Sequence, residues 1–367
     1  MTPQTIAEIP TPALIVDVAA MERNIRTMAD FYAEGPCKLR PHFKAHKTAE
    51  IARRQLAGGN CTGFTCATVA EAEIVADFCD NILIANQVIG AGKVARAADI
   101  ASRGIEITVA VDSQEGLDQL SAAAQARGSE IGVVIDVNVG MPRCGVSPEE
   151  APELARRAAD TAGITLRGAM GYEGHVVGIP DRDKRAAGAR SAMDRLSAAV
   201  TGIRDAGLPC AIVSAGGTGT FDITGRIDGI TEIQAGSYVL MDTAYAKLDI
   251  PFEHALWVLG TIISRASPSL LVADSGHKAC TEDHGNPDVR DLAGANLLFL
   301  SDEHASVMVP PDCPLQIGDR IQLIPSHVDP TINLHDVIYA VDGERVVDIW
   351  PITARGYAEQ RAARADG

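Results

Sequence analysis

The sequence predicts an α/β fold, a (β/α)8 TIM barrel binding a ligand at its mouth, together with a mainly-β domain. From residue 38 to about residue 236, short β-type runs alternate with longer amphipathic runs, a pattern typical of consecutive βα units. After about Tyr245 the pattern changes to Val/Ile/Leu alternations broken by Pro, Gly and Asp. The length of 367 residues fits a barrel plus a smaller domain.

Eight runs are apolar enough to form strands buried on both faces of a parallel sheet. We expect them at residues 38–43, 61–66, 82–86, 106–111, 131–137, 166–172, 210–214 and 232–235. The runs between them carry apolar residues at helical spacing, such as Leu117 and Leu120 in 116–127 and Met193 and Leu196 in 192–203. Each helix would therefore place one apolar stripe on the barrel.

The β domain is expected to combine both ends of the chain. Strand-like runs occur at 257–264, 270–273, 320–325 and 336–341. The run 13–17 is also a strand, but it precedes the first expected helix, 19–31, so we expect it to pair with the C-terminal strands. The predicted domains are residues 18–245 for the barrel, and 1–17 with 246–367 for the β domain.

Composition excludes several classes of function. The formal net charge of −16 repels a phosphate backbone and an anionic membrane surface, and no Lys/Arg stripe compensates it, so we expect neither nucleic acid nor membrane as a partner. No signal peptide or apolar run of about 20 residues is present, which predicts a cytoplasmic protein. The eight cysteines, without a C-x-x-C pair, indicate reduced thiols rather than disulfides or structural zinc.

Functional groups of a TIM barrel gather at the C-terminal ends of its strands. The first strand ends in Arg40-Pro-His-Phe-Lys44-Ala-His-Lys47, which places Lys44 just inside the barrel mouth. Desolvation and the neighbouring cations Arg40 and Lys47 are expected to lower its pKa toward the amine form that a Schiff base requires. Solvated loop lysines are an equally weighted alternative on spacing alone.

Two glycine-rich turns follow the seventh and eighth strands, where barrels usually bind phosphate. They read Ser214-Ala-Gly-Gly-Thr-Gly-Thr220 and Gln234-Ala-Gly-Ser-Tyr238. Free backbone N–H groups and small side chains suit a phosphate. Taken alone, however, either glycine-rich stretch is more often an ordinary turn without a ligand. The candidate phosphate residues are Ser214, Gly217, Thr218, Gly219, Gly236, Ser237 and Tyr238.

The fifth and sixth strands lead to Arg143 and to Tyr172-Glu-Gly-His175. Arg143 is a candidate to face a pyridine nitrogen, because its permanent charge would keep that nitrogen unprotonated, and Tyr172 would lie near the ring. A surface arginine and a barrel-rim tyrosine are the structural alternatives.

The segment Ser326-His-Val-Asp-Pro330 contains a candidate metal site. We expect the segment to be extended, so that His327 and Asp329 lie on the same side, because side chains alternate along a strand. One imidazole and one carboxylate would make a partly open site for manganese, magnesium or zinc with waters. An H-x-D taken alone is more often a structural polar pair.

An ordered set of motifs resembles the D-threonine aldolase and D-serine dehydratase-like family, over residues from about Pro10 to Gly356. The motifs are Pro41-His-Phe-Lys44-Ala-His-Lys47, Arg143-Cys-Gly-Val146, Gly216-Gly-Thr-Gly219, Gln234-Ala-Gly-Ser-Tyr238, Asp302-Glu-His304 and Ser326-His-Val-Asp-Pro330. The resemblance implies a fold-type III pyridoxal 5'-phosphate (PLP) enzyme, similar to alanine racemase. Such enzymes are usually homodimers whose active sites include residues of both subunits.

By that matching Lys44 carries PLP, Arg143 lies by its pyridine, Tyr172 lies near the cofactor and the glycine-rich turns bind its phosphate. His327 and Asp329 match the family's metal ligands, with manganese expected and magnesium or zinc as alternatives. Aldolase-like members tend to have H-x-D where dehydratase-like members often have H-x-C. The resemblance therefore implies a lyase that cleaves D-3-hydroxy amino acids, such as D-threonine, to glycine and an aldehyde.

The chain departs from the aldolase pattern at one catalytic position. The family's base is expected where this sequence has Gly178, and His175, in a Tyr-x-Gly-His setting shared with some dehydratase-like members, is the candidate to replace it. A dehydratase acting on D-serine or a 3-hydroxyaspartate therefore stays open. Two further alternatives are disfavoured. An amino acid racemase would have no use for the metal-binding pair His327 and Asp329. A non-catalytic PLP carrier would not require the C-terminal β domain with its metal motif.

Overall fold

The computed structural model describes residues 2–357. The chain forms two compact units. The barrel unit contains Met28–Lys44 and Ala52–Gly236, and the β-rich unit contains Met1–Thr27, Ala45–Ile51 and Ser237–Gly367. Our division at residues 18–245 stays a prediction, and residues 358–367 of the expected β domain lie outside the described residues.

The barrel unit contains all eight predicted strands, in one parallel sheet ordered β2-β9-β8-β7-β6-β5-β4-β3. Their bounds are β2 Lys38–Leu39, β3 Phe64–Cys66, β4 Asn81–Gln87, β5 Glu106–Val111, β6 Ile131–Asp136, β7 Ile164–Gly171, β8 Ile212–Ala215 and β9 Glu232–Ile233. The strand β2 is shorter than the predicted 38–43, since Pro41 has no N–H to donate to a ladder. The chain beyond it nevertheless stays bonded to the β9 side, because the N–H of His42 donates to the carbonyl of Ala235 at 3.1 Å.

The sheet closes on itself through β2. On one side Lys38 pairs with Glu232 of β9. On the other side, isolated parallel bridges join Leu39 to Cys61 and His42 to Thr65. The predicted TIM barrel is thus confirmed.

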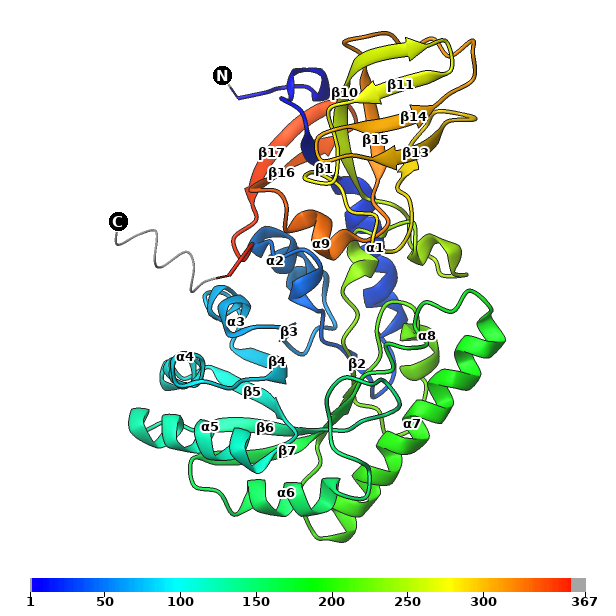
Figure 1. Ribbon diagram of the computed structural model, residues 1–367. Helices are drawn as coiled ribbons and strands as arrows, with labels where there is room; N and C mark the ends of the chain where they lie inside the picture. The colour runs from blue at the N-terminus through cyan, green and yellow to red at the C-terminus, as the bar shows by residue number, and fades with distance from the viewer. Residues whose placement is uncertain (1, 358–367) are drawn as a thin grey trace. The chain divides into compact units, whose positions relative to one another are not determined.

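Helices surround the outer face of this sheet (Figure 1). They are α3 Val69–Val75, α4 Ala91–Ser102, α5 Gln114–Arg127, α6 Ala151–Ala159, α7 Arg182–Asp205 and α8 Phe221–Thr224, and α1 Val18–Phe31 and α2 Ala49–Gly58 have residues in both units. Polar side chains define several N-termini: Thr68, Ser113 and Asp181 each accept a hydrogen bond from a backbone N–H in the first turn. Gly128 ends α5 in the left-handed conformation, at φ 61°.

The barrel interior is filled in layers, as alternation along each strand requires. A middle layer consists of Leu83, Ala110, Val134 and Met170, from four neighbouring strands, and each is at most 1% exposed. These side chains are therefore packed against one another and closed to solvent.

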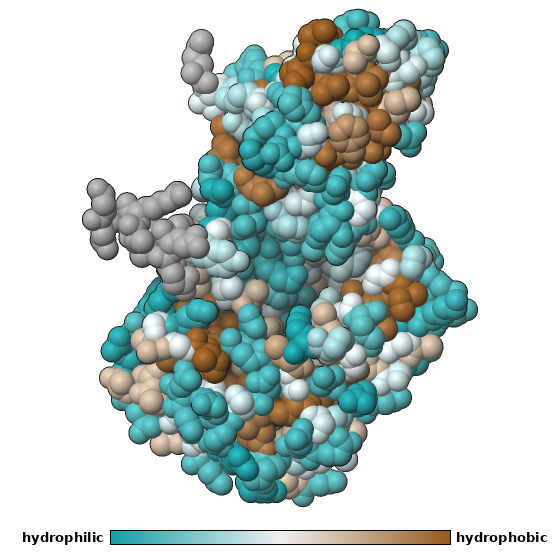
Figure 2. Space-filling view, viewed as in Figure 1, coloured by the Kyte–Doolittle hydropathy of each residue, from teal (hydrophilic) through white to brown (hydrophobic). Residues whose placement is uncertain are grey.

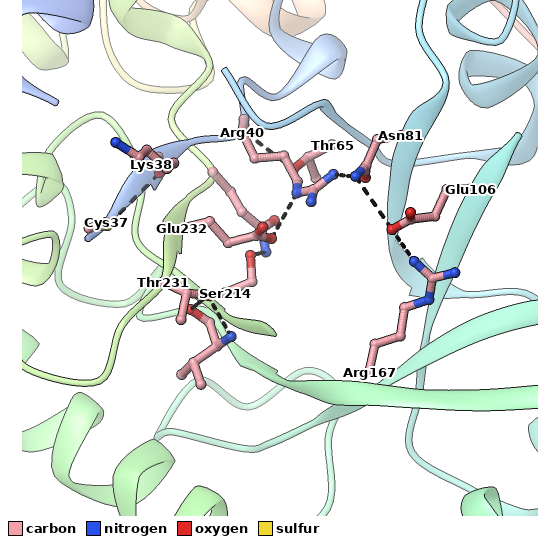
Figure 3. Close-up of polar contacts among 12 residues, drawn as sticks. Cys37, Lys38, Arg40, Thr65, Asn81, Glu106, Arg167, Ser214, Thr231 and Glu232 are labelled. Atoms are coloured by element: carbon pink, nitrogen blue, oxygen red, sulfur yellow. Dashed lines mark hydrogen bonds and ion pairs between the residues drawn. The ribbon is translucent and has the colours of Figure 1, made fainter. Parts of the chain in front are cut away.

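A polar network lies at the N-terminal end of the same interior (Figure 3). The guanidinium of Arg40 donates from Nε to Glu232 Oε1 at 2.8 Å and from Nη1 to Asn81 Oδ1 at 2.7 Å. Asn81 in turn bonds Glu106, which pairs with Arg167. The side chains of Arg40 and Glu232 are only 3% and 5% exposed. Arg40 is thus paired with a buried carboxylate, and its expected effect on the pKa of Lys44 stays a prediction.

The β-rich unit is built on a nine-stranded sheet with the central order β13-β14-β11-β10-β1-β16-β17. Its strands are β1 Ala13–Asp17, β10 Leu256–Ser267, β11 Leu270–Ala273, β12 Asp288–Val289, β13 Asn296–Leu300, β14 Ala305–Met308, β15 Arg320–Ile324, β16 Val337–Asp342 and β17 Arg345–Pro351. As predicted, β1 joins the C-terminal strands, antiparallel to β10 and parallel to β16. Ile15, Trp257 and Leu259 form its core with Val341.

One part of this sheet exposes large apolar side chains. Ile263, Leu298, Phe299 and Met308, from β10, β13 and β14, are between 41% and 52% exposed. Figure 2 shows brown, apolar areas on this part of the β-rich unit. No helix within residues 2–357 is long and apolar enough to cross a bilayer.

We predict that Glu232→Ala destabilises the barrel unit by about 3–5 kcal/mol, because it leaves the Arg40 charge buried without its carboxylate. The control is Asp99→Ala, which removes the partner of Arg127 in a pair that is about half exposed. It should change stability little, since exposed pairs contribute little. Urea unfolding followed by circular dichroism measures both, and equal shifts for the two variants would contradict the prediction.

Candidate active site

The residue Lys44 lies at the C-terminal mouth of the barrel, in the 3₁₀ turn Phe43–Ala45 that follows β2, and is partly buried. The ring of Phe43 is completely buried and meets Phe64 edge-on at 6.3 Å. The N–H of Thr65 donates to the carbonyl of Pro41 at 2.9 Å. The segment that carries Lys44 is thus held by the strands on both sides of it.

The loops after β6 and β7 bring three predicted residues together. The guanidinium carbon of Arg143 lies 5.5 Å from the centroid of the Tyr172 ring. A methyl group on Gly217 would lie 3.3 Å from Cε2 of Tyr172, so the first glycine-rich turn packs on the same ring. A methyl group on Gly140 would lie 3.1 Å from Nε2 of His175. The barrel mouth therefore gathers a cation, a phenol, an imidazole and a glycine-lined surface.

The buried carboxylate of Glu173 organises the first glycine-rich turn. It is completely buried and accepts hydrogen bonds from the N–H of Gly216 at 3.1 Å, Thr220 Oγ1 at 2.7 Å and Thr224 Oγ1 at 2.6 Å. The N–H of Gly217 is bonded to Thr220 Oγ1 at 3.3 Å. The expectation of free N–H groups along this turn is thus wrong for Gly216 and Gly217.

The remaining candidate phosphate residues differ in their surroundings. Ser214 is completely buried and accepts a hydrogen bond from Gln234 Nε2 at 2.8 Å. Tyr238 is also completely buried, with its ring 5.5 Å from that of Phe252. Ser237 donates to Asp329 Oδ1 at 3.4 Å, which links the second turn to the candidate metal pair. The phosphate-binding roles of these residues, and of Thr218, Gly219 and Gly236, stay predictions.

Sequence reasoning missed two acids at the barrel mouth. Asp136 ends β6, is 5% exposed and accepts a hydrogen bond from Gln87 Nε2 at 2.8 Å. Burial raises the pKa of Asp136 to about 6, and Asp112 adds to the rise while the Gln87 bond and Arg143 oppose it. Asp112 accepts the N–H of Gly145 at 3.1 Å. Both acids are therefore tied to the loop that carries Arg143.

The segment around His327 is not extended as predicted. His327 precedes the short helix α9, Val328–Ile332, and Asp329 lies in its first turn. Pro330 fits a first helical turn, where its missing N–H has no partner to lose, which explains the error. The two side chains still face each other, with Nε2 of His327 3.9 Å from Oδ1 of Asp329. Asp242, whose pKa burial raises to about 6, accepts the N–H of Val328 at 3.2 Å and fixes the start of the helix.

A second group of residues, also missed, lies on the other side of the His327 ring. Oδ2 of Asp283 lies 2.6 Å from Nδ1 of His327. The ring of His284 stacks on that of His327, with centroids 4.1 Å apart and an interplanar angle of 12°. The adjacent residues Asp283 and His284 were the only sign of this group in the sequence. They could not be connected to His327, because His327 lies 44 positions after Asp283.

The donor set fits the groups that the sequence implies. Ligands lie about 2.0–2.2 Å from a bound zinc or magnesium ion, so an imidazole nitrogen and a carboxylate oxygen 3.9 Å apart can share one divalent ion. In the barrel unit, a lysine at the mouth and a glycine surface on which Tyr172 packs fit a flat cofactor with a phosphate.

Two family models match the chain. Residues 16–244 match the model described as alanine racemase, N-terminal domain, and residues 255–341 match a putative serine dehydratase domain. The chain is 38% identical to a D-threonine aldolase of an Arthrobacter species, over 96% of this chain and 94% of that protein. It is 35% identical to a 3-hydroxy-D-aspartate aldolase of Paracoccus denitrificans, over 95% and 93% respectively.

A solved structure is similar over nearly the whole chain. The crystal structure of D-threonine aldolase from Filomicrobium marinum superposes with a TM-score of 0.94 at 38% identity, and the match covers 97% of this chain and 99% of that one. The likeness therefore includes the barrel and the C-terminal strands alike.

We predict that Asp136→Asn changes the pH dependence of stability. The folded protein raises the pKa of Asp136 to about 6, above its unfolded value of about 3.9, so the folded state holds this proton more tightly. The wild type should lose about 2 kcal/mol relative to the variant between pH 4 and pH 7. Urea midpoints of both proteins across this range measure the difference. A constant difference would show that Asp136 is ionised throughout.

Proposed function

Because the chain belongs to the D-threonine aldolase and D-serine dehydratase-like family of PLP lyases, we propose that it cleaves the Cα–Cβ bond of a D-3-hydroxy amino acid to give glycine, or a related amino acid, and an aldehyde. The observation that carries the proposal is the His327 and Asp329 pair, whose facing nitrogen and oxygen lie 3.9 Å apart. Its carboxylate is the ligand typical of aldolase-like members. The two aldolases at 38% and 35% identity support the same reaction.

In this proposal the barrel residues bind the cofactor. Lys44 holds PLP through its amine, Arg143 faces the pyridine nitrogen and Tyr172 lies against the ring. Glu173 keeps the first glycine-rich turn in the shape that receives the phosphate, since it fixes one amide and two hydroxyls of that region. When bound, PLP would supply a sink for the electron pair left at Cα, and a divalent ion a Lewis acid for the β-hydroxyl.

The proposed base is His175. It accepts the proton of the substrate's β-hydroxyl as the Cα–Cβ bond breaks, so the β-carbon leaves as an aldehyde. The exposed ring of His175 lies against Gly140, at the start of the loop that carries Arg143. At Gly178, where the family's base is expected, an added Cβ atom would have no neighbouring atom within 4 Å. His175 is therefore the imidazole available in this loop.

The alternative is a dehydratase that acts on D-serine or a 3-hydroxyaspartate and releases ammonia and a 2-oxo acid. The match of residues 255–341 to a putative serine dehydratase domain and the Tyr-x-Gly-His setting of His175 favour it. In that reaction Lys44 would remove the Cα proton, and hydroxide would leave from Cβ.

We further propose manganese as the metal, a homodimer as the assembly and the cytoplasm as the location. The carboxylate of Asp329 supports manganese, since carboxylate and water ligands suit this ion. The exposed apolar side chains of β10, β13 and β14 support an interface, since large exposed apolar patches mark interaction sites. The eight cysteines are all free thiols, which suits a reducing compartment.

We predict that the protein, supplied with PLP and Mn²⁺, forms glycine and an aldehyde from D-threonine, D-phenylserine or 3-hydroxy-D-aspartate, and that EDTA abolishes the activity. Chromatographic analysis of amino acids, aldehydes and 2-oxo acids measures the products. Ammonia with a 2-oxo acid, including from D-serine, would establish the dehydratase instead.

We predict that His175→Asn lowers kcat by about 10²–10⁴-fold, the range expected for loss of a general base, with the visible absorption of bound PLP unchanged. Gly178→Ala is the matched control in the same loop, since its methyl group would enter open space. Its kcat should stay near that of the wild type. If His175→Asn retains full kcat, another group removes the proton.

A further inference from the structure

We propose that Asp283 is a positioning residue for the metal site: it holds His327 through Nδ1, so that Nε2 faces the divalent ion together with Asp329. The inference rests on the metal pair of the proposed function. It assigns Asp283 to the hydrogen-bonded surroundings of His327, and it leaves His284, whose ring stacks on that of His327 without a hydrogen bond, outside the metal site.

The two nitrogens of His327 face different carboxylates. Nδ1 lies 2.6 Å from Oδ2 of Asp283, and Nε2 lies 3.9 Å from Oδ1 of Asp329. A contact of 2.6 Å between an imidazole nitrogen and a carboxylate oxygen requires a proton between them, so the proton is assigned to Nδ1. In the neutral ring the lone pair is then on Nε2, on the side of Asp329. Histidine ligands commonly donate their second N–H to a carboxylate, which fixes the tautomer and the ring orientation.

The same geometry excludes a metal ion shared by Asp283, His284 and His327, although their ligand atoms all lie within 4.8 Å of one another. An imidazole lone pair lies in the plane of its ring, so a bound ion must lie near the plane of each ring that binds it. The rings of His284 and His327 are stacked, 12° from parallel with centroids 4.1 Å apart, so their planes do not meet near the two rings. The 2.6 Å contact is also shorter than the separation of about 3 Å between neighbouring ligands of one ion.

The loop that carries Asp283 is fastened to the start of α9. Thr281 Oγ1 donates to the carbonyl of His327 at 3.3 Å, and the N–H of Thr281 donates to Thr331 Oγ1 at 3.2 Å. Ser326 Oγ donates to the carbonyl of Thr281 at 3.3 Å. Asp283, two residues farther on, is therefore held beside the His327 ring by these contacts of Thr281 and Ser326, in addition to the hydrogen bond that its own carboxylate accepts from Thr281. A substitution at Asp283 should leave this loop in place.

The experiment measures Mn²⁺ affinity of the PLP-loaded protein from the electron paramagnetic resonance signal of free Mn²⁺. Asp283→Ala should weaken binding about tenfold, the lower end of the effect of such partners, because the Asp283 side chain is 46% exposed. Asp283→Asn should restore binding to within about threefold, since its amide oxygen accepts the same hydrogen bond. Asp329→Ala should abolish specific binding.

Two variants serve as controls. Asp291→Asn changes a side chain that is 81% exposed, in the same unit, at a φ of 55° that asparagine tolerates. His284→Ala removes the stacked ring. Both should bind Mn²⁺ within about twofold of the wild type, as expected for residues that do not ligate or orient a ligand.

The outcomes separate this inference from the proposed function. If Asp329→Ala binds Mn²⁺ as the wild type does, the metal pair itself is wrong. If Asp329→Ala loses binding but Asp283→Ala keeps it, the positioning role of Asp283 is wrong. If His284→Ala loses binding as strongly as Asp329→Ala, His284 is a ligand and the stacked arrangement does not describe the metal-bound protein.

A second measurement does not depend on the variants at Asp283. The ¹⁵N shifts of labelled histidine in the metal-free protein, with His327→Asn used to assign the signals, report which ring nitrogen carries the proton. We expect protonation at Nδ1 of His327. A neutral ring protonated at Nε2 would overturn the proposal.

Discussion

Closure of the barrel by the short strand β2 is the constraint on which the candidate cofactor site depends. Only Lys38 and Leu39 form the regular ladder with β9, yet the N–H groups of Arg40, His42 and Thr65 continue the bonding on both sides of the segment. Lys44 follows directly, so its position relative to the neighbouring strands is fixed by backbone bonds. The buried pair of Arg40 and Glu232 crosses the same junction from inside the barrel. The lysine proposed to carry the cofactor thus follows a segment that is bonded to the strands on both sides of it.

The glycine-rich turn illustrates how a ligand site is prepared by residues that do not touch the ligand. Glycine allows the left-handed conformation at Gly216, φ 73°, where a methyl group would lie 2.7 Å from Ile233. Glycine also leaves the turn flexible, and Glu173 removes that freedom by accepting three hydrogen bonds from it and the residues that follow. Because Glu173 directly follows Tyr172 in the chain, the ring that packs on Gly217 and the carboxylate that holds Gly216 are set by the same end of β7.

The sequence was sufficient for the fold because the barrel strands and helices have strong local patterns. All eight strands were found, and the pairing of β1 with the C-terminal strands followed from its place before the first helix. The candidate site was harder to predict from the sequence than the fold. Pro330 was compatible with both an extended segment and a first helical turn, and local pattern alone did not distinguish them. Three acids of the site were missed because their hydrogen-bond partners lie in distant segments of the chain. A single sequence does not show which distant residues are in contact, and this applies to Glu173, Asp136 and Asp283.

The open space at Gly178 bears on how this loop changes in evolution. A Cβ atom added there would have no neighbouring atom within 4 Å, and His175 occupies an exposed position three residues earlier. A lineage can therefore acquire a histidine at one position before it loses the histidine at the other, passing through an intermediate with both. Both positions are exposed, so the location of the imidazole can change on the surface of this loop while the strands beneath it stay the same.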